Sequence, residues 1–149
     1  MSDRVFAKIS AALGRLPAGT IVLTSCHDGK RAGVLVNWVQ RCAEEPLLIS
    51  VAAKKGHRIE PIIRDSHSFA VCMIDAGDKL VQHKFRMRAM CEEDSDPFDA
   101  IGVCTMVTGA PVLRSCLLAL DCEVVRHFDL EADYELYVGQ VMAARFGEE

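Results

Sequence analysis

The sequence predicts a mainly β protein, with about seven strands and two or three short helices. Short apolar segments recur along the chain and are separated by turn residues, among them the Asp28-Gly29 pair. Several of these segments are apolar at consecutive positions, which indicates strands that are buried on both faces, as in a barrel or a covered sheet. Many short strands with few helices favour a barrel over a doubly wound sheet.

The first segment is expected to be a helix, because its apolar residues recur at three- and four-residue steps. Asp3 is expected to cap its start, and Gly14 and Pro17 are expected to end it. A second, short helix is expected at about residues 56–65, and a third at about 78–85. The apolar residues of the first helix are Val5, Phe6, Ile9, Ala12, Leu13 and Leu16.

The strand predictions follow the apolar segments between turns. The Asp28-Gly29 pair predicts a two-residue hairpin turn. The last two strands are expected to form a long antiparallel hairpin with its turn at 129–133. Residues 91–98 hold several carboxylates and Pro97 and are expected to form an exposed acidic loop. The expected strands cover residues 19–26, 31–40, 47–53, 69–74, 102–108, 115–128 and 134–146.

Composition narrows the classes of partner and compartment. The chain has 17 basic and 21 acidic residues, a net charge of −4, which argues against a nucleic-acid partner. No apolar stretch is long enough for a membrane-spanning helix, and no secretory signal is visible, so no membrane association is expected. The seven cysteines form no C-x-x-C pair. We interpret them as reduced packing residues of a cytoplasmic protein, and no metal site is expected.

Three stretches, taken in order, resemble a known family. They are residues 16–24 (LPAGTIVLT) with 32–39 (AGVLVNWV), residues 45–52 (EPLLISVA) with 54–59 (KKGHRI), and residues 109–113 (GAPVL) with 120–124 (LDCEV) and 136–141 (LYVGQV). Their order and spacing resemble the flavin reductase-like family over about residues 16–146. The resemblance implies a split β-barrel with Greek-key connections that binds flavin mononucleotide (FMN), as a single domain over residues 1–149.

The resemblance also implies which residues hold the flavin. Ring contacts fall on consecutive residues of the second expected strand, where main-chain N–H and C=O groups can bind ring heteroatoms whatever the side chain. Asn37 is expected there as a buried amide whose partners a ligand supplies. The implied ring contacts are Leu35, Val36, Asn37 and Trp38.

The implied phosphate contacts are richer in cations than is usual for the family, and a cation can replace a hydroxyl at a phosphate. The N–H groups of residues 56–59, at the start of the second helix, are expected to face the phosphate as well. Lys54 and Lys55 are equally consistent with solvated residues at the end of a strand that contact no ligand. Trp38 is consistent with a core position or a dimer contact as well as with a ring contact. The implied phosphate contacts are Arg41, Cys42, Ala53, Lys54, Gly56 and His57.

The function that the resemblance implies is an NAD(P)H:flavin oxidoreductase that uses FMN, with FAD as an alternative, and supplies reduced flavin to a partner such as a monooxygenase. No catalytic side chain is required, because the hydride passes between two bound nucleotides. The family's Gly-Asp-His before the last strand is replaced here by Ala132-Asp133-Tyr134. Tyr134 is therefore the candidate nicotinamide contact.

That replacement leaves two alternatives open. The first is an FMN-binding electron-transfer flavoprotein that serves a redox protein and does not use NAD(P)H directly. The second is a family member that has lost flavin binding. The resemblance further implies a homodimer with the flavin site near the subunit interface.

Overall fold

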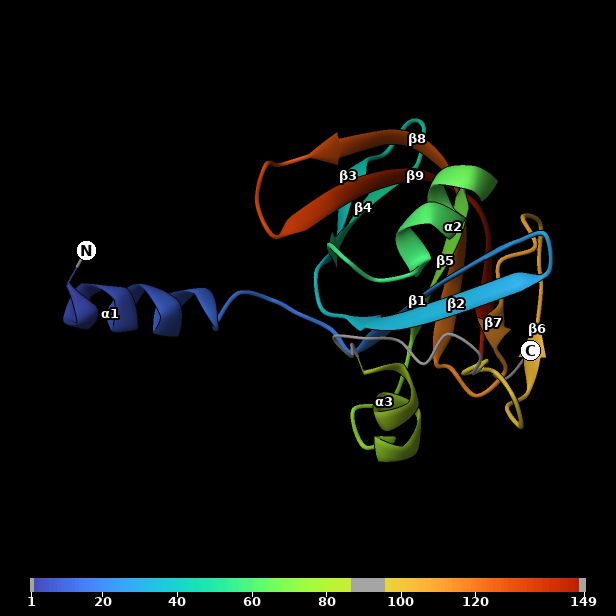
Figure 1. Cartoon of the computed structure of the whole chain (residues 1–149), viewed down its shortest axis with the longest axis horizontal. Coiled ribbons are helices and arrows are strands. Elements are labelled where there is room, and N and C mark those ends of the chain that lie inside the picture. The colour runs from blue at the N-terminus through green and yellow to red at the C-terminus, as the bar shows by residue number, and fades with distance from the viewer. Residues whose placement is uncertain (1, 87–95, 148–149) are drawn as a thin grey trace.

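Seven antiparallel strands form one curled sheet in the order β2-β1-β5-β8-β9-β4-β3. The computed structural model, shown in Figure 1, describes residues 2–86 and 96–147. The seven strands are β1 (Ile21–His27), β2 (Lys30–Val36), β3 (Val39–Ala43), β4 (Leu48–Lys54), β5 (Ser68–Met73), β8 (Leu118–Asp129) and β9 (Tyr134–Phe146). A separate pair consists of β6 (Val103–Cys104) and β7 (Val112–Leu113). The predicted mainly β, barrel-like architecture is confirmed.

The β1–β2 hairpin has the predicted two-residue turn. Asp28 and Gly29 both have positive φ angles, 51° and 77°, as a type I′ turn requires. His27 pairs with Lys30 across the turn, and the register continues to the Ile21–Val36 pair. The Asp-Gly signal therefore fixes the register of the first hairpin.

The prediction of a single strand over residues 31–40 is wrong, because two strands occupy this stretch. β2 ends at Val36 and β3 begins at Val39. The Asn37 carbonyl accepts a hydrogen bond from the Gly19 amide beside β1, whereas the Trp38 carbonyl accepts one from the Ala52 amide of β4. The chain thus crosses at these two residues from one edge of the sheet to the other.

Two apolar clusters cover opposite faces of the sheet. Leu23 and Phe69 belong to the cluster that α2 (Ile59–Ser66) covers with Ile59 and Ile63. Val22 and Cys72, on the same two strands, belong to the other cluster, to which α3 (Lys79–Phe85) adds Val81 and Phe85. Neighbouring residues of one strand point to opposite faces, so both faces of β1 and β5 are buried, as predicted.

The predicted helices are present, with shifted starts. α1 (Asp3–Leu13) is capped by the Ser2 side chain and ends at Gly14; Asp3 lies in its first turn and is not the cap. Asp78 caps α3 through the Val81 amide. No helix in the described part of the chain is long and apolar enough to cross a membrane.

The strand predicted over residues 102–108 is much shorter in the structure, because only the two residues of β6 pair with another strand, β7. The following residues form a loop in which the Val107 and Thr108 amides both donate to the buried Asp121 carboxylate at 2.8 Å. A buried carboxylate needs such donors, and they draw this segment away from strand pairing. Residues 91–95 of the expected acidic loop lie outside the described residues, and Asp96 forms an ion pair with Arg31.

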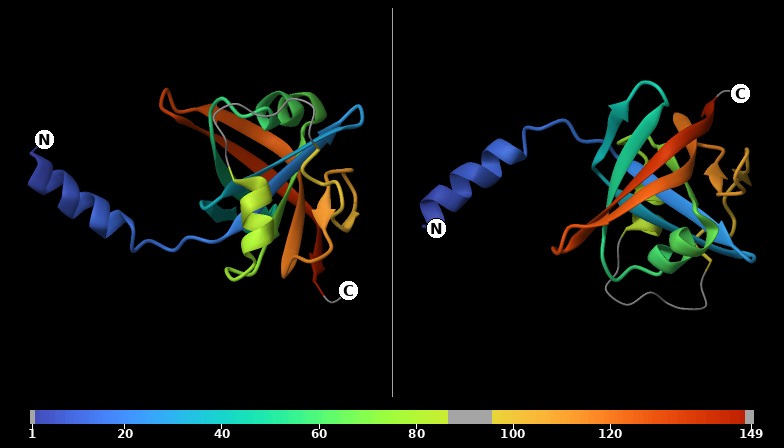
Figure 2. Two further views of the ribbon diagram at one scale, coloured as in Figure 1. Left: turned by 60° about the horizontal axis from the view of Figure 1, so that its bottom comes forward. Right: turned by 90° about the horizontal axis from the view of Figure 1, so that it is seen from above.

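The helix α1 projects away from the barrel on an extended segment (Figures 1 and 2). None of its residues is buried. Its apolar side chains Val5, Phe6, Ile9 and Leu13 are between 42% and 62% exposed. This helix therefore presents an apolar face that the described residues of its own chain do not cover.

Candidate functional site

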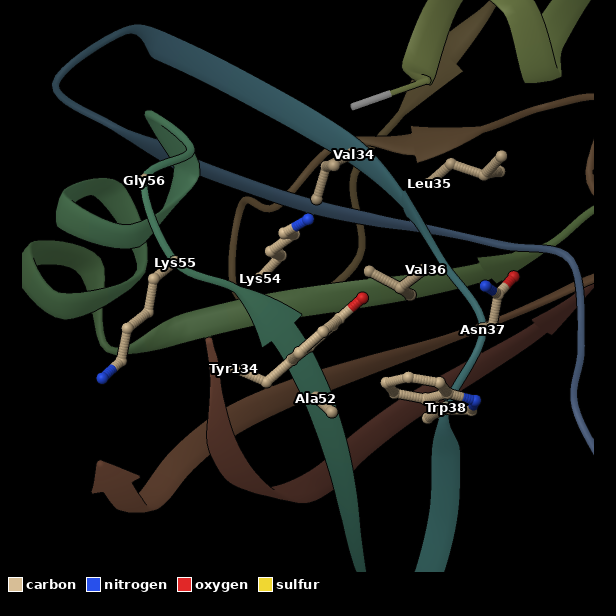
Figure 3. A pocket seen from close by; sticks show the side chains of 10 residues that line it. All are labelled: Val34, Leu35, Val36, Asn37, Trp38, Ala52, Lys54, Lys55, Gly56 and Tyr134. Carbon is tan, nitrogen blue, oxygen red and sulfur yellow. The ribbon is translucent and has the colours of Figure 1, made fainter. Parts of the chain in front are cut away.

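A cavity of about 530 Å³ opens where the two edges of the curled sheet meet. This volume lies within the range of ordinary small-molecule sites, about 300–1,000 Å³. Its walls come from β2, from the link between β2 and β3, from β4 with the turn that follows, and from the start of β9 (Figure 3). The lining residues are Val34, Leu35, Val36, Asn37, Trp38, Ala52, Lys54, Lys55, Gly56 and Tyr134.

The edge of β2 leaves main-chain groups facing the cavity. In a two-residue hairpin the pair next to the turn is hydrogen bonded, and bonded pairs then alternate along the strands. Val34 and Val36 therefore bond to β1, whereas Leu35 directs its N–H and C=O to the open edge. At Arg31, which shares the orientation of Leu35, the carbonyl accepts a hydrogen bond from Arg58. No described residue forms a hydrogen bond with the Leu35 N–H or C=O, so these groups can pair with a ligand.

Asn37 does not occupy the buried strand position that we expected. It lies between β2 and β3, and its side chain is exposed. The apolar stretch on both sides of Asn37 conceals the strand break, which is why the sequence suggested a buried amide. The structure places Asn37 at the cavity rim, where its side chain is free to meet a ligand.

Two aromatic rings meet at the cavity. The Trp38 and Tyr134 ring centroids are 4.9 Å apart, with the ring planes inclined by 49°. Trp38 is 52% exposed, so the described residues do not bury it as a core side chain. Figure 3 shows the Tyr134 hydroxyl directed toward Val36 across the cavity. The two rings form a wall suited to a flat aromatic ligand.

The two adjacent lysines are not equivalent. The Lys55 ammonium lies 2.6 Å from Asp129, and this hydrogen bond raises the pKa of Lys55. The Lys54 ammonium forms no hydrogen bond or ion pair with any residue of the described ranges. Figure 3 shows Lys54 directed into the cavity and Lys55 directed away from it. Lys54 is therefore the cation that can bind an anionic group of a ligand.

The turn after β4 does not present all of its amides to the cavity. The Gly56 amide donates to the Glu60 carboxylate at 3.0 Å, and the Ile59 amide donates to Nδ1 of His57 at 3.1 Å. Gly56 has φ +94° and no atom within 4 Å of an added Cβ. The open space beside Gly56 can admit a ligand group, but these two amides are already bonded within the chain.

Four of the residues predicted for the site lie outside the cavity lining. Arg41 and Cys42 are exposed on β3, and Ala53 is buried in the core. His57 is only 7% exposed, and burial lowers its pKa to about 4. A buried, neutral His57 that accepts the Ile59 amide stabilises the turn.

Two lining residues, Val34 and Ala52, were not among the predicted contacts, whereas Lys55 was expected as a cation near the phosphate. Val34 precedes Val36 on the same face of β2, and Ala52 and Lys54 share a face of β4, so strand alternation could have indicated Val34 and Ala52. Lys55 lines the cavity although its ammonium is bonded to Asp129. In the described ranges, no group of three His, Cys, Asp or Glu residues could hold a metal ion.

Together these features suit a planar aromatic ligand that carries an anionic group. The open Leu35 edge can bind ring heteroatoms, Trp38 and Tyr134 can pack on the ring, and Lys54 can neutralise the anion. The donor set thus fits a flavin nucleotide, with the Lys54 ammonium at the anionic end where a hydroxyl is more usual in the family.

Comparisons with known proteins give the same assignment. The family model described as "Flavin reductase like domain" matches residues 13–149. The NADH:FAD oxidoreductase SgcE6 of Streptomyces globisporus C-1027 superimposes with a TM-score of 0.82 at 22% identity, covering 97% of this chain and 84% of that one. Nitrilotriacetate monooxygenase component B from Mycobacterium thermoresistibile superimposes with a TM-score of 0.80 at 21% identity, covering 97% and 78%.

Among curated proteins, the chain is similar to putative diflavin flavoprotein A 3 of Nostoc sp. (strain PCC 7120). The two are 27% identical over 133 residues, which is 88% of this chain but only 23% of that protein. This chain therefore corresponds to less than a quarter of that relative.

The buried His57 predicts a component of stability that depends on pH. Its pKa of about 4 in the folded protein lies below the usual 6.5, so between these values the unfolded chain binds a proton that the folded protein excludes. The free energy of unfolding should fall as pH is lowered from 6.5 to 4, by up to about 3 kcal/mol from this group. Urea unfolding at several pH values measures this change in the free energy of unfolding.

The matched variant is His57→Asn, whose side-chain oxygen can still accept the Ile59 amide but does not titrate. The stability difference between the wild type and this variant should shrink as pH falls. His83→Asn, which changes an exposed histidine of α3, is the control. A difference that stays constant from pH 7.5 to 4 would show that His57 contributes no such component.

Proposed function

The chain belongs to the flavin reductase-like family, and from this we propose that it is an NAD(P)H:flavin oxidoreductase that binds FMN in the cavity along the open edge of β2. The observation that carries the proposal is the makeup of this cavity: six of the ten residues expected to hold the flavin line it. These six are Leu35, Val36, Asn37, Trp38, Lys54 and Gly56.

The chain's own groups have binding and positioning roles in this proposal. The Leu35 main chain binds the polar edge of the ring, and Trp38 and Tyr134 limit its tilt and exclude water from one side. Lys54 binds the phosphate. When bound, the flavin supplies the chemistry, which is acceptance of a hydride from the nicotinamide. Tyr134, in place of the family's histidine, is the proposed nicotinamide contact.

Two structural neighbours have titles that bear on the flavin and on the partner that uses it. The structural neighbour from Mycobacterium is by its title a monooxygenase component, and the neighbour from Streptomyces is an NADH:FAD oxidoreductase. The Mycobacterium title supports a monooxygenase as the consumer of the reduced flavin, and the Streptomyces title supports FAD as the alternative to the FMN that we propose from the family resemblance.

A second candidate function is electron transfer without NAD(P)H. The curated relative from Nostoc is by name a diflavin flavoprotein, and the present chain matches 23% of it. In such a protein the flavin would be reduced by another protein or domain. The Tyr134 replacement favours the same candidate, because the family's usual nicotinamide contact is absent.

The deciding experiment is an anaerobic absorbance spectrum of the protein with FMN or FAD, before and after addition of NADH or NADPH. The proposal predicts that the visible absorbance of the oxidised flavin is lost with at least one reductant. Retention of the oxidised spectrum with both, while flavin remains bound, would favour the electron-transfer protein. A protein that binds neither flavin in a fluorescence titration would be the flavin-binding-deficient member.

The phosphate contact predicts different effects for the two adjacent lysines. Lys54→Ala should weaken FMN binding about tenfold, the size expected for one charge-assisted hydrogen bond. Lys55→Ala is the matched control and should change binding little, because Asp129 already holds that ammonium away from the cavity. Fluorescence titration with FMN and with riboflavin measures both effects. Equal losses in the two variants, or an equal loss for riboflavin, would contradict the contact.

The exposed face of α1 supports the proposal that the protein is a homodimer. An apolar helix face without a partner in its own chain is stabilised when a second copy covers it. Light scattering should give twice the chain mass of 16.4 kDa. Changing Phe6 and Ile9 to Ser should shift the protein toward the monomer, whereas Arg4→Ser on the opposite side of the helix should not. A wild-type mass of one chain would contradict the homodimer.

We propose a cytoplasmic location. Its support is that Cys26, Cys42, Cys72, Cys104, Cys116 and Cys122 are free thiols, as is usual in a reducing compartment. Recovery of the native protein in a secreted or membrane fraction would contradict it.

A further inference from the structure

Two carboxyl groups lie together behind the turn that closes the cationic end of the cavity. Glu60, on α2, accepts the Gly56 amide through Oε2 at 3.0 Å. Glu135, on β9, directly follows the cavity residue Tyr134 and pairs in register with Ala53 of β4. The two carboxyls act on each other: Glu135 raises the pKa of Glu60, and Glu60 lowers the pKa of Glu135, as expected for carboxyls close enough to share a hydrogen bond. The pair therefore connects α2 and β9 beside the cavity wall.

A hydrogen bond between two carboxyls requires a proton on one of them. The second oxygen of Glu60, Oε1, is buried, and no donor in the described residues reaches it. A buried carboxylate oxygen without a donor is costly, and two adjacent carboxylates also repel each other. One shared proton removes both costs, because it supplies the missing hydrogen and cancels one charge.

The surrounding groups decide which carboxyl holds the proton. Glu135 accepts the Tyr137 hydroxyl at 3.1 Å and lies 3.4 Å from Nε2 of His127, whose ring stacks on Tyr137. Among the described residues, the Glu60 carboxyl accepts a hydrogen bond from the Gly56 amide alone. Burial and Glu135 raise the pKa of Glu60, whereas the bond with Glu60 lowers that of Glu135. The charged or titratable groups that act on the pair are Tyr137, His127, Arg64 and Lys55.

The same turn sets the direction of Lys54. Lys54 pairs with Tyr134, and the Lys55 amide donates to the Asp133 carbonyl at 2.9 Å. The Gly56 amide is then held by Glu60, in a backbone conformation with φ +94°. A loss of the Glu60 contact would release this turn at its third residue, next to the cation that enters the cavity.

We propose that Glu60 is a positioning residue, which acts as a carboxylic acid hydrogen bonded to Glu135 and to the Gly56 amide and so holds the 54–56 turn in the shape that receives the flavin phosphate. The proposal rests on the proposed flavin site. When pH rises and the shared proton is lost, the two carboxylates repel each other, the turn loosens and flavin binding weakens.

The test compares Glu60→Gln with Glu60→Ala. A glutamine can accept the Gly56 amide and donate to Glu135 at every pH, as the protonated acid does, whereas alanine can do neither. FMN affinity is measured by fluorescence titration between pH 5 and 9. Glu60→Ala should weaken binding about tenfold at low pH, and Glu60→Gln should match the wild type there. Glu44→Gln, in an exposed turn, is the control and should follow the wild type at every pH.

The decisive quantity is the ratio of the wild-type Kd to the Kd of Glu60→Gln as a function of pH. This ratio cancels ionisation of the FMN phosphate, which both proteins share. It should be near one at low pH and rise as pH increases. A ratio that is constant with pH overturns the positioning role and leaves the proposed flavin site intact.

A measurement on the flavin-free protein tests directly whether the two carboxyls share a proton. Carboxyl carbon NMR of the free protein should show one glutamate that titrates above the usual glutamate range, and this signal should be absent in Glu60→Gln. If every glutamate titrates within or below the usual range, no proton is shared. If the wild type binds no flavin at any pH, the proposed function is overturned, and the positioning role with it. The carboxyl titration still shows whether Glu60 and Glu135 share a proton.

Discussion

The unpaired edge of β2 is the constraint on which the site depends. A main-chain N–H or C=O group in an apolar environment must find a partner, and a closed barrel would supply it from the next strand. Here β2 and β3, the two edge strands, are joined through Asn37 and Trp38 and not through a ladder of hydrogen bonds. The Leu35 main chain is thereby left for a ligand. The incomplete sheet thus leaves an open main-chain edge beside the cavity.

The cationic end of the cavity is arranged by contacts that join distant parts of the chain. Asp129, at the end of β8, binds Lys55 and so leaves Lys54 to the cavity. Glu60 from α2 holds the Gly56 amide, and the Asp133 carbonyl before β9 accepts the Lys55 amide. The two contacts to main-chain amides, at Lys55 and Gly56, order the turn, and the surrounding sheet keeps the turn beside the two aromatic rings. Affinity for an anionic group would then depend on this preorganisation.

The sequence predicts the regular parts of the fold well and the irregular parts poorly. The Asp28-Gly29 turn and the bounds of β9 follow from local patterns, because turn chemistry and apolar alternation are local properties. The break at Asn37 and Trp38 does not, because apolar residues lie on both sides of it and only the tertiary hydrogen bonds of Asn37 with Gly19 and of Trp38 with Ala52 reveal it. Nor could the sequence distinguish Lys54 from Lys55, since Asp129 lies seventy-four residues further on. Burial of His57 is likewise a tertiary property.

The central claim is that the open edge of β2 binds the flavin ring through the Leu35 main chain. Amide hydrogen exchange of the protein with and without FMN, resolved by residue, tests it most directly. Exchange at Leu35 should be fast in the free protein and slow with FMN, whereas Val34 and Val36, which bond to β1, should be slow in both states. Exchange at Leu35 that is unchanged by saturating FMN would contradict the account.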